Sequence, residues 1–222
     1  MSAQFFALVP AAGSSSRMGR PKLLLPVSGR PLIEHTLMAW QRSRVDRIVV
    51  VVRPGDQPLV EAVNRFKLQS STFKVEVVVP EVAPVDMKAS VQAALRYIQN
   101  QYQPTDTDAF LVAPADMPRL SSPIIDRLID RHATQSAGTI VVPTIGGRRG
   151  HPVLFSWPLV QHVFALPAEE GLNALVDGHQ SASIACEDLA SGGEYPFEDV
   201  DTREEYEGLA SRASDGLGGS LH

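Results

Sequence analysis

The residues that follow the first apolar run of the chain have the types and spacing that binding a polyphosphate requires. The run FFALV at residues 5–9 ends at Pro10, and small residues and two cations follow it. These are Ala11, Ala12, Gly13, Ser14, Arg17 and Lys22. Small side chains let backbone N–H groups approach a ligand closely, and two cations beside them suit phosphate oxygens. The spacing is neither that of a Walker A loop nor G-x-G-x-x-G. The segment therefore predicts a phosphate-binding loop, and a loop that merely turns the chain is the alternative.

A carboxylate lies just beyond a second apolar run. Asp116 stands in FLVAPADMPRL at residues 110–120, where a buried carboxylate without a partner would be unfavourable. Mg²⁺ takes carboxylate oxygens together with substrate phosphates, so Asp116 facing the first loop would hold the metal against a triphosphate. A turn or N-cap aspartate before Pro118 is the alternative. If Asp116 awaits a metal, its charge is uncompensated without one, and Asp116→Asn should leave thermal stability equal or higher.

Two further segments combine charge with turn residues. In PFEDVDTREEY, residues 196–206, Asp201 is either a second metal ligand or part of a helix start, with Asp201 or Thr202 as N-cap. In GGRRGHPVLF, residues 146–155, glycines beside Arg149 and His151 predict a flexible loop that meets an anion. A solvated basic loop is the alternative for that segment.

Together these motifs resemble the nucleotidyltransferases that join a nucleoside triphosphate to a phosphorylated acceptor. The first segment has the form A-A-G-x-S-x-R-M-G-x-x-K-L-L-L-P. It is most similar to the MobA-like group, and within that group to the molybdenum cofactor cytidylyltransferases. The resemblance covers residues 5 to 210. It implies a Mg²⁺-dependent enzyme in which Lys22 and Arg17 are catalytic and, with Ala11, Ala12, Gly13 and Ser14, bind the nucleotide.

The resemblance also implies roles for the later segments. The D-M-P after a strand and the D-V-D-T run point to Asp116 and Asp201 as the metal ligands, and R-G-H-P-V places Arg149 and His151 on the acceptor side. PVDMKASVQAAL, residues 84–95, is similar to a helix start that meets the nucleotide, which implicates Ser90. The chain departs from the family pattern at Asp86, Lys88, Glu170 and Asn173.

The implied substrates are a nucleoside triphosphate and a phosphorylated small molecule. Ala-Ala-Gly in place of Ala-Gly-Gly favours CTP over GTP, and the leading acceptor is the molybdopterin form of the molybdenum cofactor. A sugar phosphate or methylerythritol phosphate acceptor remains open, although the H-D-x-A-R-P run of the latter family is absent. A nucleotide-binding chaperone that carries cofactor to a molybdenum hydroxylase without turnover also remains open.

Apolar runs of strand length alternate with helix-length segments. Strands are expected at residues 5–9, 48–52, 73–79, 109–113, 139–142, 153–155 and 183–186, and helices at 31–42, 56–68, 89–102 and 121–132. This alternation predicts an α/β, three-layer, Rossmann-like fold with a mostly parallel sheet and helices on both faces. Past Pro143 the pattern loosens, which predicts edge or antiparallel strands. In such sheets ligands bind outside the carboxyl ends of the strands, where all these motifs fall.

The 222 residues favour one domain over 1–210, with a Gly- and Ser-rich, flexible tail over 211–222. A net charge of −5 argues against a nucleic-acid surface. The single cysteine, Cys186, excludes an internal disulfide and is expected to be a small buried hydrophobe. No segment has the ~20 apolar residues of a membrane helix. A cytoplasmic protein is therefore expected.

Overall fold

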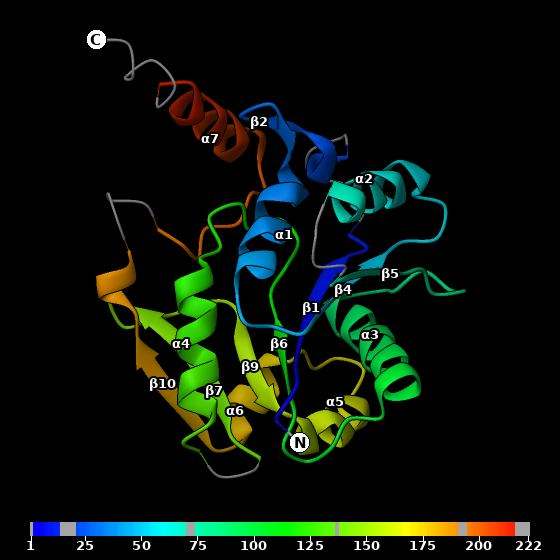
Figure 1. Ribbon diagram of the computed structural model, residues 1–222, viewed down its shortest axis with the longest axis vertical. Coiled ribbons are helices and arrows are strands. Elements are labelled where there is room, and N and C mark those ends of the chain that lie inside the picture. The colour runs from blue at the N-terminus through cyan, green and yellow to red at the C-terminus, as the bar shows by residue number, and fades with distance from the viewer. Residues whose placement is uncertain (1, 14–20, 70–73, 136–137, 191–194, 216–222) are drawn as a thin grey trace.

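The chain folds into a central sheet with helices on both faces. The computed structural model describes residues 2–13, 21–69, 74–135, 138–190 and 195–215, and of 212–215 only the backbone. Within this part of the chain the main sheet has eight strands, seven of them in the order β10-β7-β9-β6-β1-β4-β5, with β8 paired to β7 (Figure 1). The strands are β1 (Phe5–Ala11), β4 (Arg47–Val52), β5 (Val75–Val78), β6 (Ala109–Val112), β7 (Ile140–Ile145), β8 (Arg148–Arg149), β9 (Val153–Ser156) and β10 (Ser181–Ala185). The predicted α/β fold with a mostly parallel sheet is confirmed.

Both faces of the central strands are apolar because both are covered by helices. In β1, Ala7 and Val9 face one buried cluster, whereas Phe6 and Leu8 face the other. β4 alternates in the same way, with Val50 in the first cluster and Val49 in the second. Continuous apolar runs of this kind are what a doubly covered parallel sheet requires.

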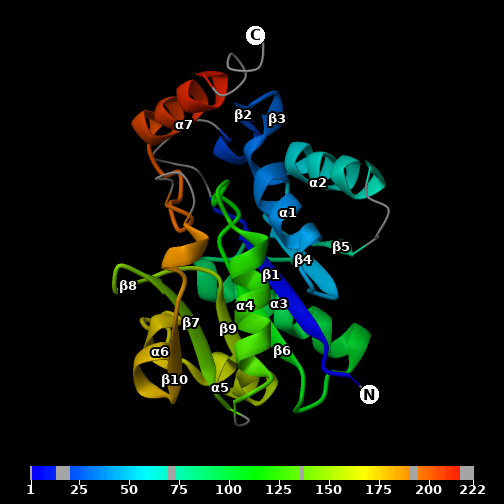
Figure 2. The same cartoon turned by 60° about the vertical axis from the view of Figure 1, so that its left-hand side comes forward.

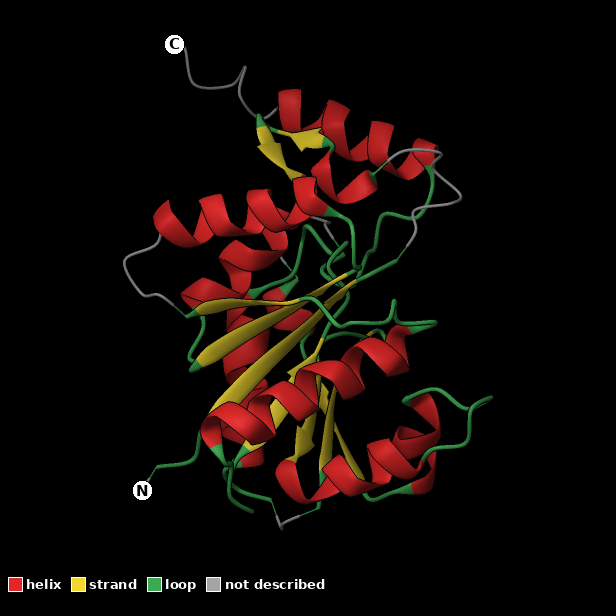
Figure 3. Ribbon diagram, turned by 90° about the vertical axis from the view of Figure 1, so that its right-hand side faces the viewer, coloured by secondary structure: helices red, strands yellow, loops and turns green. Residues whose placement is uncertain are grey.

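Six helices supply the two outer layers of the described structure. α1 (Leu32–Arg42), α2 (Gln57–Gln69) and α4 (Ser122–His132) bury their apolar sides in the first cluster. α3 (Met87–Tyr102), α5 (Val160–Ala165) and α6 (Asn173–Gly178) bury theirs in the second cluster. Figure 3 shows the sheet between these layers, and Figure 2 shows α4 against the strands.

The strand directions match the expectation for the second half of the chain. β1 runs parallel to β4 and β6, and β10 runs parallel to β7 at the edge of the sheet. β9 is antiparallel to both of its neighbours, β6 and β7. The predicted strand over 73–79 is observed as β5, and its first residue lies outside the described part of the chain.

Several short elements were not predicted. The strands β2 (Pro26–Val27) and β3 (Arg30–Pro31) form a hairpin whose turn residues Ser28 and Gly29 have φ of 47° and 77°. Two positive φ values are the requirement of a tight primed turn, which Gly satisfies easily. Within the described residues three 3₁₀ helices also appear, at Lys22–Leu24, Trp157–Leu159 and Glu187–Leu189.

The C-terminal segment folds back over the N-terminal half. Helix α7 (Arg203–Asp215) lies beside the hairpin in Figures 1 and 2, and Tyr206 Oη donates a hydrogen bond to the Pro26 carbonyl at 2.7 Å. Because α7 continues past residue 210, the expected boundary of the tail falls inside a helix. Cys186 is fully buried with a free thiol, as predicted. None of the described helices is long and apolar enough to cross a membrane.

Candidate active site

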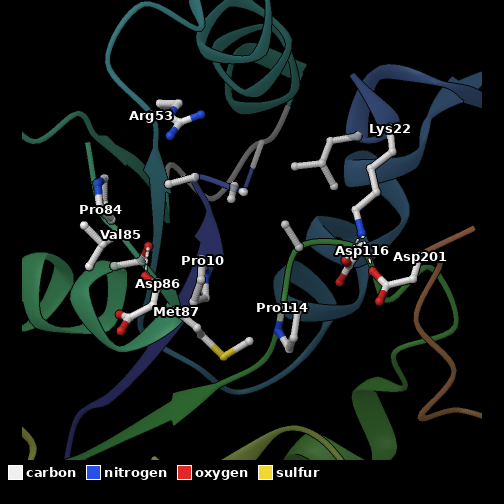
Figure 4. A pocket seen from close by; sticks show the side chains of 16 residues that line it. Pro10, Lys22, Arg53, Pro84, Val85, Asp86, Met87, Pro114, Asp116 and Asp201 are labelled. Atoms are coloured by element: carbon white, nitrogen blue, oxygen red, sulfur yellow. Dashed lines mark hydrogen bonds and ion pairs between the residues drawn. The ribbon is translucent and has the colours of Figure 1, made fainter. Parts of the chain in front are cut away.

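A cavity of about 370 Å³ opens at the carboxyl ends of β1, β4 and β6. Its lining includes seven residues that the sequence assigned to the site, namely Ala11, Ala12, Gly13, Lys22, Ser90, Asp116 and Asp201. Figure 4 shows Lys22 and the two aspartates on one side of this nucleotide cavity, and Arg53, Pro84 and Asp86 on the other. Ser14 and Arg17, which the sequence also assigned to the site, lie outside the described residues.

The charged side of the cavity is a cluster of one ammonium and two carboxylates. Lys22 Nζ lies 2.5 Å from Asp116 Oδ2 and 2.8 Å from Asp201 Oδ1. Burial by itself lowers the pKa of Lys22, but the charges and hydrogen bonds of Asp116 and Asp201 outweigh it and raise the pKa above its usual value. Lys22 is therefore protonated throughout the neutral range.

This ion pair overturns one expectation about Asp116. The expected gain in stability of Asp116→Asn rested on an uncompensated carboxylate, yet Asp116 has an ammonium partner before any metal binds. Both side chains are mostly buried, at 14% and 15% exposure, so Asp116→Asn removes one of the two carboxylates that compensate the charge of Lys22. Loss rather than gain of stability follows for the protein without metal.

Backbone contacts bring the two carboxylates together. The Ala115 N–H donates to the Pro10 carbonyl at 3.2 Å, which ties the end of β6 to the end of β1. The Val200 N–H donates to the Asp116 carbonyl at 3.1 Å, which places Asp201 beside Asp116. Asp201 thus reaches the cavity from a segment that no strand of the sheet contains.

The helix-start interpretation of the 201–205 segment is observed, and the metal-ligand role of Asp201 remains a prediction. The Thr202 hydroxyl accepts from the Glu205 N–H at 3.2 Å, and Glu205 Oε2 accepts from the Asp201 and Thr202 N–H groups at 2.7 and 2.8 Å. This is a capping box that starts α7. Because Thr202 and Glu205 do the capping, the side chain of Asp201 is left to face Lys22.

The two aspartates fit a hard divalent cation. Asp116 Oδ1 is buried and accepts no hydrogen bond in the described structure, which leaves one carboxylate oxygen for a further ligand. The part of the chain with known placement contains no group of three His, Cys, Asp or Glu residues able to hold a metal. Two carboxylates alone do not complete a coordination shell. Mg²⁺ is commonly bound in this way, with substrate phosphates and waters as its remaining ligands.

A second cavity of about 280 Å³ adjoins the first, because Asp86 and Met87 line both. Its floor is apolar, with Val112, Val153 and Phe155, and its other wall comes from residues 168–173. His151 also lines this cavity, and its Nδ1–H donates to the Val112 carbonyl at 3.3 Å. Burial lowers the pKa of His151, although that hydrogen bond and the carboxylates Asp199 and Asp116 partly oppose the shift. A neutral imidazole results.

Arg149 and Ser90 differ from what their predicted roles require. Arg149 is exposed and lines neither cavity, and its guanidinium pairs with Asp177 at 2.6 Å. The Ser90 hydroxyl lines the nucleotide cavity but donates to the Asp86 carbonyl at 3.2 Å, within the first turn of α3. The acceptor-side role of Arg149 and the nucleotide role of Ser90 remain predictions.

The two departures in the 84–95 segment have structural explanations. Asp86 is the N-cap of α3, and its carboxylate accepts from the Ala89 N–H at 2.7 Å, so the helix begins at Met87 rather than at Ala89. Lys88 is buried and bonds to backbone carbonyls of the 167–170 loop. Sequence reasoning also missed Arg53, which directly follows β4 and lines the nucleotide cavity. Its place at a strand's carboxyl end was the available signal.

Gly150 explains the glycine of the R-G-H-P-V run. A Cβ at this position would overlap the ring of Phe197, so the ring packs directly on the glycine backbone. Phe197 precedes the segment that carries Asp199 and Asp201 and belongs to the first buried cluster. The contact between Gly150 and Phe197 therefore holds the loop before β9 against the segment that carries Asp201.

Comparison with known proteins shows similarity to nucleotidyltransferases. Residues 7–183 match the family described as the MobA-like NTP transferase domain. The chain is 34% identical over 143 residues to 2-C-methyl-D-erythritol 4-phosphate cytidylyltransferase of Nitrosospira multiformis, and the match covers 63% of this chain and 59% of that protein. It is 29% identical over 205 residues to a probable molybdenum cofactor guanylyltransferase of Bacillus mycoides, covering 90% and 92%.

Solved structures share the fold. A homologue of Mycobacterium tuberculosis Rv0371c from Mycobacterium sp. strain JC1 has a TM-score of 0.74 at 22% identity, covering 97% of this chain and 99% of that one. Rv0371c of M. tuberculosis H37Rv, crystallised with manganese, has a TM-score of 0.67 at 22% identity, covering 95% and 100%. The family match ends at residue 183, so Asp201 comes from outside the matched region.

Proposed function

The chain belongs to the MobA-like NTP transferase family, and on that premise we propose that it is a Mg²⁺-dependent nucleotidyltransferase. It would transfer a nucleotidyl group, CMP from CTP, to a phosphorylated small molecule and release pyrophosphate. The observation that carries the proposal is the nucleotide cavity, where the small residues after β1 face the cluster of Lys22, Asp116 and Asp201.

The reaction needs no nucleophile from the protein. An oxygen of the acceptor phosphate attacks the α-phosphorus of the triphosphate in line, and the bond from that phosphorus to the pyrophosphate oxygen breaks. The chain's contribution is positioning and charge neutralisation. Backbone N–H groups around Ala11 to Gly13 would meet the phosphates, and Lys22 would neutralise oxygens that gain charge on the leaving pyrophosphate. Arg17 is proposed as a second cation for the same phosphates.

Asp116 and Asp201 would hold the metal. Mg²⁺ when bound would neutralise part of the negative charge on the phosphate oxygens. The same two carboxylates hold Lys22 in the metal-free structure, so the triphosphate would compete with Asp116 and Asp201 for its ammonium, and the metal would compete with that ammonium for the two carboxylates. The manganese-bound structure of a protein with the same fold is compatible with a divalent metal in this chain.

For the acceptor we propose the molybdopterin form of the molybdenum cofactor, bound partly in the second cavity, with a molybdenum enzyme as the recipient of the product. The resemblance of residues 146–155 to the cofactor cytidylyltransferases and the match to a probable molybdenum cofactor guanylyltransferase over most of both chains support it. The match to a methylerythritol phosphate cytidylyltransferase supports CTP but covers only 59% of that enzyme.

A thermal-shift comparison of CTP, GTP, ATP and UTP with Mg²⁺ tests the nucleotide. We expect CTP to raise the melting temperature most, because phosphate contacts are common to all four and the base must supply the difference. A site that hydrogen-bonds one base leaves buried groups unpaired with another, at about 1–3 kcal/mol for each. A larger shift with GTP would assign the chain guanylyl transfer, and no Mg²⁺-dependent shift with any of them contradicts the proposal.

Pyrophosphate release separates an enzyme from a carrier. CTP and Mg²⁺ are incubated with molybdopterin, with methylerythritol phosphate and with a sugar 1-phosphate, and pyrophosphate is measured in each. Release in the molybdopterin incubation and in neither of the others supports the proposed acceptor, and release with another compound reassigns it. Tight binding of CTP and cofactor with no release would identify a non-catalytic chaperone instead.

A further inference from the structure

Lys88 is a buried cation that the proposed reaction does not use. It occupies the second position of α3, directly after the two residues that line both cavities, and only 8% of it is exposed. It also lines the second cavity. A lysine in such a place would ordinarily indicate a phosphate site, since an ammonium is rarely buried without an anion or several acceptors.

Lys88 Nζ instead donates to three backbone carbonyls of one loop. Its partners are Ala168 at 3.0 Å, Glu170 at 2.7 Å, and Pro167. An ammonium has three N–H donors, so these bonds use all of them. The partners are 79 to 82 residues away in the sequence, so Lys88 ties the start of α3 to the connection between α5 and α6.

The loop that Lys88 holds has little burial of its own. Residues 167–171 are all exposed, whereas Leu172 packs partly against the second buried cluster. Within the loop the Glu170 N–H donates to the Pro167 carbonyl at 3.2 Å, which makes a single turn but does not attach that turn to the rest of the molecule. The attachment comes from Lys88, and residues 168–173 form one wall of the second cavity.

We infer that Lys88 is a positioning residue for the acceptor, because it fixes the wall of the second cavity to the same helix start that borders the nucleotide cavity. This inference rests on the proposed function and extends it. Lys88 then sets the distance between the acceptor and the nucleotide, although its side chain contacts neither substrate. Because the donors of Lys88 are all engaged, the second cavity receives an uncharged part of the acceptor, and the acceptor's phosphate lies in the nucleotide cavity.

The chemistry around the second cavity agrees with an uncharged occupant. Glu169 and Glu170 belong to its wall and would repel a second anionic group. His151 is held neutral, and the floor of Val112, Val153 and Phe155 is apolar. The one arginine that the sequence assigned to this side, Arg149, pairs with Asp177 and does not line the cavity.

Hydrogen exchange of the protein without substrates tests the attachment directly. Lys88→Met should accelerate exchange over residues 166–172 and leave the strands unchanged. Lys74→Met is the matched control, since Lys74 also donates to a carbonyl, that of Ser43 at 3.4 Å, but lies away from both cavities. A lysine that waits for a phosphate would leave exchange of the free protein unchanged on mutation, and that result overturns the inference.

Steady-state kinetics test the functional part, with CTP and whichever acceptor releases pyrophosphate in wild type. We expect Lys88→Met to raise the KM for the acceptor by roughly tenfold to a hundredfold, with the KM for CTP almost unchanged. If Lys88→Met folds poorly, Lys88→Arg distinguishes a lysine that holds the loop from one that binds a phosphate. A planar guanidinium binds a phosphate well but cannot reproduce three carbonyl contacts of one tight turn, so the acceptor KM should still rise.

The outcomes distinguish this inference from the function on which it rests. If no acceptor releases pyrophosphate with wild type, the proposed function fails, and exchange over residues 166–172 still decides whether Lys88 holds the loop. If pyrophosphate is released and the KM for CTP rises as much as that for the acceptor, or Lys88→Arg restores wild-type kinetics, the positioning role is wrong.

Discussion

At the scale of single residues, Lys22 has the largest expected effect on the reaction. Its ammonium is shared by Asp116 and Asp201, and its raised pKa keeps it charged at neutral pH. We expect Lys22→Ala to lower the rate of pyrophosphate release by about 10²–10³, the usual cost of losing one charge-stabilising donor. Rates are measured at saturating CTP and Mg²⁺, with Lys74→Ala as control and circular dichroism to confirm folding. A variant that keeps the wild-type rate would remove Lys22 from the chemistry.

Asp199 gives a prediction on stability whose sign depends on pH. Burial first, and then the charge of Asp116, raise its pKa above the ordinary value of 3.8. The folded protein therefore binds this proton more tightly than the unfolded chain, and stability falls as pH rises from 3.8 through the folded-state pKa. At neutral pH the ionised carboxylate is a net cost, so Asp199→Asn should increase the free energy of unfolding when metal is absent.

Denaturant unfolding in the presence of a chelator measures this effect. The gain from Asp199→Asn should be largest at neutral pH and should disappear below pH 3.8, where the carboxyl is protonated in both states. Asp188→Asn should not increase stability at neutral pH, because the hydrogen bonds from Arg127 lower the pKa of Asp188 and favour its ionised form. A loss of stability in Asp199→Asn at neutral pH would mean that the ionised form makes favourable contacts.

At the scale of elements, the contact between Gly150 and Phe197 joins the loop before β9 to the segment that carries Asp201. We expect Gly150→Ala to displace the ring, and with it Asp201, so that stability falls by about 1–3 kcal/mol and Mg²⁺-dependent CTP binding weakens. Calorimetric titration of CTP with and without Mg²⁺ measures the binding.

Gly178→Ala is the matched control for that substitution. A Cβ at Gly178, the last residue of α6, meets no atom within 4 Å, so this change should leave metal-dependent binding intact. If Gly150→Ala lowers stability but leaves the Mg²⁺ dependence of CTP binding unchanged, the contact packs the core without placing the carboxylate.

The elements also show how far the sequence alone could lead. The strand over 48–52 was predictable because it is a continuous β-branched run, and the helix over 31–42 because its apolar residues recur at helical spacing. The hairpin of β2 and β3 was missed because two-residue strands carry no periodicity. The start of α3 was placed two residues late because the capping role of Asp86 depends on a local hydrogen bond that competes with other uses of the side chain.

The site residues were predictable where a charged residue stands in a recognisable motif. Lys22, Asp116 and Asp201 were identified from their motifs, and the structure brings them within ion-pair distance. The pairing of Arg149 with Asp177 and the burial of Lys88 depend on residues 28 to 82 positions away. Contacts at such separations depend on how the helices and the sheet pack together, which a local sequence pattern does not predict.

At the scale of the whole molecule, the sheet order explains why distant segments share one site. β1 lies between β4 and β6, so the chain leaves β1 toward one side for β4 and β5 and returns to the other side for β6. Ligand sites of open α/β sheets form at such a reversal, outside the carboxyl ends of the strands. The alternation of strands and helices predicted this parallel half, but it could not predict that β9 inserts between β6 and β7.

The late position of Asp201 has a consequence for how the protein becomes functional during its synthesis. Domains form from the N-terminus as the chain leaves the ribosome, and the last strand, β10, ends at Ala185, before Phe197, Val200 and Asp201 have emerged. A nascent or truncated chain that stops at residue 190 has every strand that the structure describes in the sheet, yet lacks the carboxylate that lies 179 positions from Lys22. Synthesis therefore completes the described sheet first and the charge cluster last, and we expect a product that ends at residue 190 to bind nucleotide with Mg²⁺ more weakly than the full chain.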